Sequence, residues 1–282
     1  MKIRGALKEF SKYASLNVMG MIGLSCYILA DTFFVSKGLG ANGLAALNLA
    51  IPIYSFIHGS GLMVGMGGGI KYSVLRSRGG SGTVFTNAIY LAAVLAAVFV
   101  LIGLFFTEGI LTLFGAEGTV LNMSVTYLRV LLLFAPAFIA NNLILCFVRN
   151  DGAPQLSMAA MITGSLSNVV LDWVFIFPCG MGMFGAAFAT GLAPIISMAI
   201  LSVHFIKKRN GFRIVKTAPE PRLCVGILSG GVPSLVTEVS SGIVIIVFNA
   251  IIMGLEGNIG VAAYGVIANI SLVVIAVYTG IA

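Results

Sequence analysis

The feature that most limits the possible folds is a series of long apolar stretches that recur along the whole chain. A helix needs about 20 mostly apolar residues to cross the hydrocarbon core of a bilayer, and each stretch is long enough. Hydrophobic residues make up 59% of the chain and charged residues 9%, whereas soluble domains average about 45–50% and about 25%. The sequence therefore predicts an all-α polytopic membrane protein. The eight predicted spans are residues 14–36, 45–70, 84–107, 123–148, 158–178, 185–206, 223–253 and 261–282.

The basic residues indicate how these helices are oriented. Of the 16 Lys and Arg residues, all except Lys37 and Arg129 fall on one side of the predicted spans. By the positive-inside rule that side is cytoplasmic, which predicts a multi-pass protein of the cell (plasma or inner) membrane with a cytoplasmic N-terminus. The same pattern accounts for the net charge of +7 without nucleic acid, since no basic helix or aromatic-basic array accompanies it.

A polar interruption at residues 207–222 divides the chain. It is rich in bases, contains two prolines and is typical of a cytoplasmic linker between two halves. In addition, GLGANGLAALNLA (38–50) resembles GLEGNIGVAAYGVIA (254–268) six spans later, which predicts a parallel repeat, although two Gly/Ala-rich loops can also match by chance. We therefore expect a six-helix N-terminal lobe (1–206), the linker, and the first two helices of an incomplete C-terminal lobe (223–282). Two equal lobes need about 430 residues, so the chain is expected to be C-terminally truncated.

A carboxylate inside an apolar stretch is the strongest functional signal. In the run SLSNVVLDWVFIF, Asp172 follows Asn168 by one helical turn, so the two side chains share a face. An ionised Asp within the membrane costs about 2.5–3.5 kcal/mol on insertion scales and marks a functional site by default. Depth counted along the predicted helices places Asp31, Tyr127 and Thr190 in the same outer half of the first lobe, where one polar cavity can hold them.

The pair formed by Asp31 and Asp172 predicts an ion or proton site. Two carboxylates in a low-dielectric cavity cannot both stay ionised cheaply, so either one is protonated or a cation lies between them. Hard oxygen ligands suit a proton or a small alkali cation and not a soft transition metal, and the choice between H⁺ and Na⁺ stays open. In the alternative interpretation Asp31 ends the first helix, Asp172 pairs with a neighbouring amide, and Tyr127 belongs to the interfacial belt.

Other polar groups and glycines occur in the apolar stretches. Glu238 is a third intramembrane carboxylate, unless it makes only a helix-end or inter-lobe hydrogen bond. Asn142 can bridge helices or line a cavity, so both residues are candidates for a cation or substrate cavity. His58 and His204 are expected to be packing residues, and the four scattered cysteines form neither a metal-ligand cluster nor a disulfide framework. The glycines of GLMVGMGGG predict close helix packing and not a phosphate loop, because no Gly-Lys-Ser/Thr follows.

These features together resemble the multidrug and toxin extrusion (MATE) family, and most closely its prokaryotic DinF-like branch. The resemblance is carried by ADTFFVSKGLGANGLAALNLAIPI from Ala30, by the loop RNDGAP from Arg149, and by the set Asn168, Asp172 and Thr190. It implies two six-helix lobes around a V-shaped cavity that opens to alternate faces of the membrane.

The resemblance also assigns roles to individual residues. It implies that Asp31, Asn168 and Asp172 bind the coupling cation and that Thr190 belongs to the same network. Tyr127 matches a fourth-helix tyrosine of such transporters. No other metal and no cofactor is expected.

The function that the resemblance implies is antiport, in which cationic or amphipathic drugs and toxins leave the cell in exchange for Na⁺ or H⁺. The partners are then a small organic substrate and membrane lipid, and a full-length chain is expected to be a monomer. One alternative is a lipid-linked precursor flippase, which needs a basic cavity, so the depth of Arg129 discriminates. Another is a non-transporting fragment or helper that assembles with a partner. An enzyme is not expected, because no nucleophile–base or metal set appears in the sequence.

Overall fold

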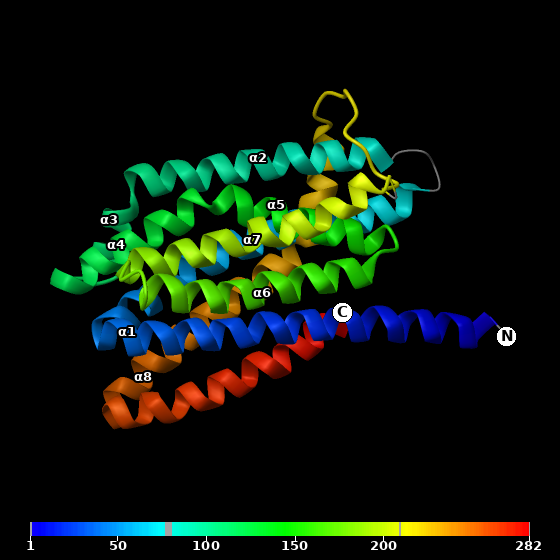
Figure 1. Ribbon diagram of the computed structural model, residues 1–282. Coiled ribbons are helices and arrows are strands. Elements are labelled where there is room, and N and C mark those ends of the chain that lie inside the picture. The colour runs from blue at the N-terminus through cyan, green and yellow to red at the C-terminus, as the bar shows by residue number, and fades with distance from the viewer. Residues whose placement is uncertain (1, 77–80, 209, 282) are drawn as a thin grey trace.

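The computed structural model describes residues 2–76, 81–208 and 210–281 and shows a bundle of long helices (Figure 1). Within these ranges the chain forms helices and loops and no strand, which confirms the predicted all-α fold. The helices are α1 (Lys2–Leu75), α2 (Ser81–Phe105), α3 (Thr107–Leu113), α4 (Gly118–Leu133), α5 (Ala135–Asn150), α6 (Pro154–Ile176), α7 (Gly182–Ile206) and α8 (Pro221–Ile281).

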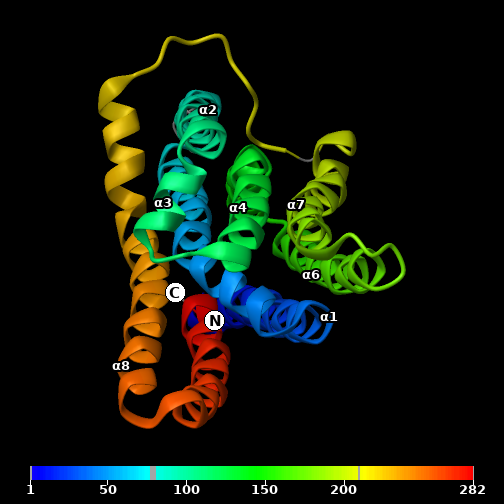
Figure 2. The same cartoon turned by 90° about the vertical axis from the view of Figure 1, so that its left-hand side faces the viewer.

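Two of these helices turn back on themselves. Helix α1 breaks at Gly40, whose φ of 68° and ψ of −160° are not helical. A positive φ is available to glycine without a steric penalty, so Gly40 separates a first arm of α1 from a second arm. Figures 1 and 2 show that α8 likewise descends, turns and returns toward the first arm of α1. Each long helix therefore provides two membrane-length arms.

The predicted spans correspond to these helices and arms, one for each stretch, although α1 begins at Lys2, well before the first predicted span at residue 14. By length and composition alone, five described helices can cross a membrane, or six if the bent pair α4 and α5 counts as one span. The pair covers the predicted span 123–148 and bends by 47°. Pro136 lies in the first turn of α5 and has no N–H to continue the hydrogen bonds of α4, which explains the bend.

The glycines of GLMVGMGGG lie where the second arm of α1 packs against α5. A Cβ atom added at Gly61 would lie 2.9 Å from Asn142 Nδ2, and one added at Gly65 would lie 2.7 Å from the Asn142 carbonyl oxygen. Real Cβ atoms do not approach other atoms so closely, so only glycine permits this helix spacing. The prediction that this motif serves packing is confirmed.

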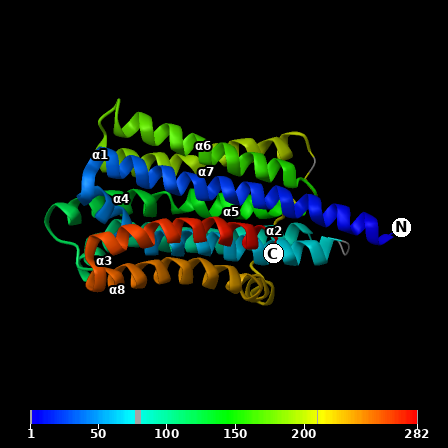
Figure 3. The same ribbon diagram turned by 90° about the horizontal axis from the view of Figure 1, so that it is seen from below.

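The second arm of α1 also packs closely against the first arm of α8. A Cβ atom at Gly67 would overlap the carbonyl oxygen of Ile227, and one at Gly231 would overlap the carbonyl oxygen of Met63. Figure 3 shows α8 running beside the other helices of the bundle. This backbone contact sets the distance between α8 and the six preceding spans, and with it the width of the space between them.

Candidate functional site

Asp31 lies in the first arm of α1, before the Gly40 bend, and faces α4. Its side chain is buried, with 6% of the residue exposed. Tyr127 in α4 is also buried and donates its hydroxyl hydrogen to Asp31 Oδ2 over 3.4 Å. Asp31 therefore lies within its helix and Tyr127 inside the bundle, which contradicts two of the three parts of the alternative interpretation.

Asp172 lies near the end of α6, one turn after Asn168, and both residues are fully buried. The Asn168 amide is satisfied at both ends when its nitrogen donates to Asp172 Oδ2 over 3.1 Å and its oxygen accepts the Thr190 backbone N–H over 3.2 Å. The hydroxyl oxygen of Thr190 lies 3.4 Å from the same amide and donates to the Ala186 carbonyl over 3.0 Å. The predicted shared face of Asn168 and Asp172 is confirmed.

The two aspartates lie close enough to interact electrostatically. Asp172 does pair with a neighbouring amide, as the alternative interpretation expected, but that bond uses only one of its oxygens. Among the residues that the structure describes, Asp31 Oδ1 and Asp172 Oδ1 are buried with no hydrogen-bond partner. Buried polar atoms are almost always paired, so two unpaired carboxylate oxygens on two interacting aspartates are unusual. The set Asp31, Tyr127, Asn168, Asp172 and Thr190 is called the candidate coupling site below.

The donors of the candidate coupling site fit a proton or a hard monovalent cation. They offer carboxylate, amide and hydroxyl oxygens, which are the ligands that alkali cations prefer over soft metals. Within the described part of the chain, no group of three or more His, Cys, Asp or Glu residues is placed to hold a metal ion. A positive charge at the two unpaired oxygens would offset the repulsion between the carboxylates.

A cavity of about 420 Å³ adjoins the candidate coupling site. Thr190 belongs to both, because it contacts Asn168 and also lines the cavity. Residues of α1, α5, α6, α7 and α8 line the cavity, so it lies between α8 and the preceding spans. The volume is in the range of small-molecule sites, about 300–1,000 Å³. The lining includes aromatic and thioether side chains, namely Tyr54, Phe138, Met66, Met158 and Met161.

Glu238 and Asn142, the two weaker candidates, both line this cavity. Glu238 Oε2 lies 3.4 Å from His58 Nδ1, and the side chain of Glu238 is 27% exposed. Asn142 donates to the His58 backbone carbonyl over 3.2 Å, and Tyr54 stacks on the His58 ring at 5.9 Å. The sequence led us to expect that His58 only packs, but this histidine also pairs with Glu238. The sequence does contain a signal from which this pair could have been predicted, namely a lone histidine and a carboxylate that each lie within an apolar stretch.

The sequence identified Arg129 as the basic residue to check, but other basic residues line the cavity. Arg129 is exposed on α4 and does not line the cavity. Arg149 does line it, and its Nη2 donates to Met66 Sδ over 2.9 Å. Together with His58, Arg149 gives the cavity two groups able to carry positive charge opposite one carboxylate, Glu238.

Comparison with known proteins gives consistent matches. The sequence profile of the MatE family matches residues 18–174. The multidrug export protein MepA of Staphylococcus saprophyticus is 28% identical over 245 residues, which cover 85% of this chain and 54% of MepA. MepA of Staphylococcus aureus strain MRSA252 is 26% identical over the same shares. The chain thus spans about half the length of the curated relatives it matches.

Solved structures match over nearly the whole chain. The outward-facing conformation of a multidrug resistance MATE family transporter of the MOP superfamily has a TM-score of 0.88 and 28% identity, covering 96% of this chain and 61% of that one. A MOP superfamily transporter from Pyrococcus furiosus, described as having a binding pocket of reverse polarity, has a TM-score of 0.84, 28% identity and the same coverage.

Proposed function

The chain belongs to the MatE family, and from that premise we propose that it is the ion-coupled portion of a secondary antiporter that exports cationic or amphipathic compounds in exchange for H⁺ or Na⁺. The observation that carries the proposal is the pair of buried, unpaired oxygens on Asp31 and Asp172, which Asn168 and Thr190 connect to a cavity of small-molecule size. An exchanger needs two binding sites whose occupancies depend on each other, and a shared residue couples them directly.

The coupling follows from charge compensation at the candidate coupling site. When a proton or cation is bound, Asp31 and Asp172 tolerate each other and the helices that carry them, α1 and α6, remain packed together. When it leaves, the repulsion favours another packing of the same helices. A ligand shifts such an equilibrium only by its difference in affinity for the two packings, and Thr190 transmits that difference to the cavity.

The cavity lining supports an organic cation or amphipathic molecule as the exported compound. Aromatic faces such as Tyr54 and Phe138 attract cations and flat rings, and thioethers such as Met158 adapt to varied shapes. Glu238 supplies one negative charge. We propose the two aspartates for the ion and Glu238 with Asn142 for the exported compound.

The proposal also covers the membrane location, the oligomeric state and the absence of catalysis. The apolar helices place the protein in a membrane as a multi-pass protein, and we propose the cell membrane with a cytoplasmic N-terminus, from the distribution of basic residues. A monomer surrounded by lipid is proposed for the full-length form. Members of the family carry their substrates without converting them, so no enzymatic activity and no cofactor is proposed.

A lipid-linked precursor flippase is the second candidate, and Arg149 is the observation in its favour. An anionic head group needs cationic wall residues, and Arg149 lines the cavity. The lining as a whole is apolar and includes Glu238, which favours a cationic compound over an anionic lipid.

Transport by proteoliposomes tests the proposal. The purified chain is reconstituted with ethidium inside the vesicles, and export is followed after a Na⁺ gradient or a pH gradient is imposed. We expect one of the two gradients to drive ethidium export and its dissipation to stop it. Export that needs neither gradient, or none under either, contradicts antiport by this chain. Movement of a fluorescent anionic lipid in place of ethidium would support the flippase.

A further inference from the structure

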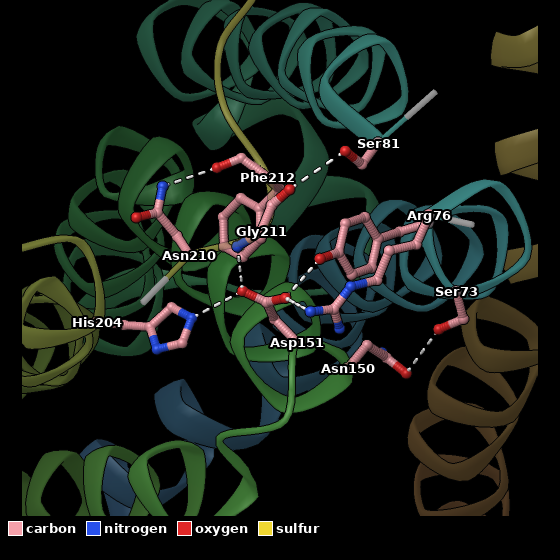
Figure 4. A network of polar contacts seen from close by, with 10 residues as sticks. Ser73, Arg76, Ser81, Asn150, Asp151, His204, Asn210, Gly211 and Phe212 are labelled. Atoms are coloured by element: carbon pink, nitrogen blue, oxygen red, sulfur yellow. Dashed lines mark hydrogen bonds and ion pairs between the residues drawn. The ribbon is translucent and has the colours of Figure 1, made fainter. Parts of the chain in front are cut away.

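A third buried carboxylate, Asp151, connects segments that are far apart in the sequence. It lies in the loop between α5 and α6, with its side chain fully buried. Tyr72 Oη donates to its Oδ1 over 2.5 Å, and Arg76 Nη2 lies 3.2 Å from the same oxygen. His204 Nε2 lies 2.9 Å from Oδ2, and the Gly211 backbone N–H donates to Oδ2 over 2.6 Å (Figure 4). These five residues form the Asp151 cluster.

The Asp151 cluster includes a residue of the segment that connects α7 to α8. Residues 210–220 of this segment, called the strap below, are extended and cross the end of α2 (Figure 2). The strap is bonded to α2 along its length and not only at Gly211. Its bonds to α2 join Gly211 O to Ser81 Oγ (3.2 Å), Val215 N and O to Thr86 Oγ1 (3.0 and 3.3 Å), Thr217 O to Tyr90 Oη (3.0 Å) and Glu220 N to Asn87 Oδ1 (2.8 Å).

The strap also contributes a side chain to the core of the preceding spans. Phe212 is fully buried. Its ring centroid lies 4.6 Å from that of Phe85 in α2, 5.4 Å from that of Phe147 in α5 and 5.4 Å from that of Phe205 in α7. A free tether between lobes would leave such a side chain in solvent, so the strap is packed as part of the first six spans.

We propose that the Asp151 cluster makes the strap a fixed part of the first lobe, so that residues 211–217 stay docked on α2 whatever ion or compound the chain has bound. The docking continues into the first turn of α8, because Asn87 Oδ1 accepts from the Glu220 backbone N–H over 2.8 Å and from Cys224 Sγ over 3.4 Å. Asp151 is the positioning residue, because its two oxygens bond the strap, α1 and α7 together. The docking of the strap does not rest on the proposed antiport.

Hydrogen–deuterium exchange by mass spectrometry, on the whole chain in lipid nanodiscs, tests the docking without any transport assay. The amides of the strap are compared with those of α5 in sodium-containing neutral buffer, in sodium-free acidic buffer and in neutral buffer with ethidium. Amides held by buried acceptors exchange only when the structure opens. We expect the Gly211 and Val215 amides to stay protected in all three buffers, with rates corrected for pH.

Three variants separate the cluster from general unfolding. In Asp151→Asn we expect strap exchange at least about tenfold faster, with α6 and α7 protected as before. Thr86→Val removes the acceptor of Val215 and leaves Asp151 intact, so the Val215 amide alone should lose protection. Asp172→Asn is the matched control, a buried aspartate whose loss should leave the strap unchanged.

Three exchange results would contradict the fixed strap. A strap that exchanges like an unstructured peptide in the wild-type chain, or that opens in any of the three buffers, overturns the fixed strap. So does an Asp151→Asn chain whose strap exchanges at the wild-type rate. Failure of ethidium export in proteoliposomes would count against antiport and would not change any of these exchange rates.

Discussion

Two buried aspartates of this chain have opposite surroundings. Asp151 has partners on both oxygens, with Tyr72 and Arg76 on Oδ1 and His204 and Gly211 on Oδ2. Asp172 has the Asn168 amide on Oδ2 and no partner on Oδ1 within the described structure. The first carboxylate is held by the protein alone, whereas the second leaves an oxygen for the proton or cation that we propose it binds. We therefore propose a structural role for the fully paired Asp151 and ion exchange at the incompletely paired Asp172.

The energetics of buried charge explain why the two arrangements differ. A buried carboxylate with cationic and hydrogen-bond partners stabilises the fold only while every partner is present, and removal of one leaves an uncompensated group. An incompletely paired carboxylate already carries that cost. Replacing Asp151 should therefore affect stability most, and replacing Asp172 should affect transport most.

The largest expected effect is loss of export in Asp31→Asn and in Asp172→Asn. Each amide keeps the shape of the side chain but removes the charge that a proton or cation would compensate, so coupling fails while the helices still pack. Gradient-driven ethidium export by proteoliposomes should fall to the level of empty vesicles. Glu108→Gln, an exposed residue of α3, is the control and should export normally. Wild-type export by both aspartate variants would refute the candidate coupling site.

The next effect concerns stability, for which the Asp151 variant should be affected more than the Asp172 variant. Asp151→Asn should lower the free energy of unfolding by about 3 kcal/mol, the scale for breaking a buried ion pair, because Arg76 and His204 lose their shared carboxylate. Asp172→Asn should leave stability unchanged or raise it. Thermal unfolding in one detergent, followed by circular dichroism, measures both. Equal losses in the two variants would mean that the pairing of the carboxylates does not distinguish their roles.

A smaller effect is expected at the residue shared by the candidate coupling site and the cavity. Thr190→Val keeps the shape but removes the hydroxyl next to Asn168, a loss of about 1 kcal/mol or about fivefold in export. Thr190→Ser restores the hydroxyl and should recover most of the activity. The ion concentration that gives half-maximal export should rise in the valine variant. An unchanged value would show that Thr190 does not link ion and cavity.

The smallest effect is expected for Tyr127→Phe. The hydrogen bond to Asp31 is 3.4 Å long and contributes below about 1 kcal/mol. Export should fall by only about twofold, and the pH at which export is half-maximal should move slightly. A complete loss would show that the tyrosine hydroxyl is itself a ligand for the transported ion.

Much of the helical arrangement and of the candidate coupling site could be predicted from the sequence. Apolar length gave the spans, and an i, i+4 spacing gave the contact between Asn168 and Asp172. Depth along the helices, which follows from a fixed rise per residue, placed Asp31, Tyr127 and Thr190 together. These inferences succeed because a membrane limits the chain to helices of nearly one length.

The Asp151 cluster and the His58–Glu238 pair could not be predicted in the same way. Asp151 lies in a loop, 53 residues from His204 and 79 from Tyr72, and loops carry no periodic signal that fixes which side chains meet. His58 and Glu238 face each other only because Gly67 and Gly231 allow α1 and α8 to approach closely. Helix rotation and tilt decide such contacts, and apolar patterning does not determine either.

The packing of Phe212 also has a consequence for the order of synthesis. Its aromatic neighbours Phe85, Phe147 and Phe205 all precede it in the chain. When α7 has left the ribosome, the first six spans still lack this ring and the backbone N–H of Gly211 that Asp151 accepts. Domains fold as units, N-terminal first, during translation. The first half therefore completes its core only after the connecting segment has emerged, and the first arm of α8 then inserts beside a finished surface.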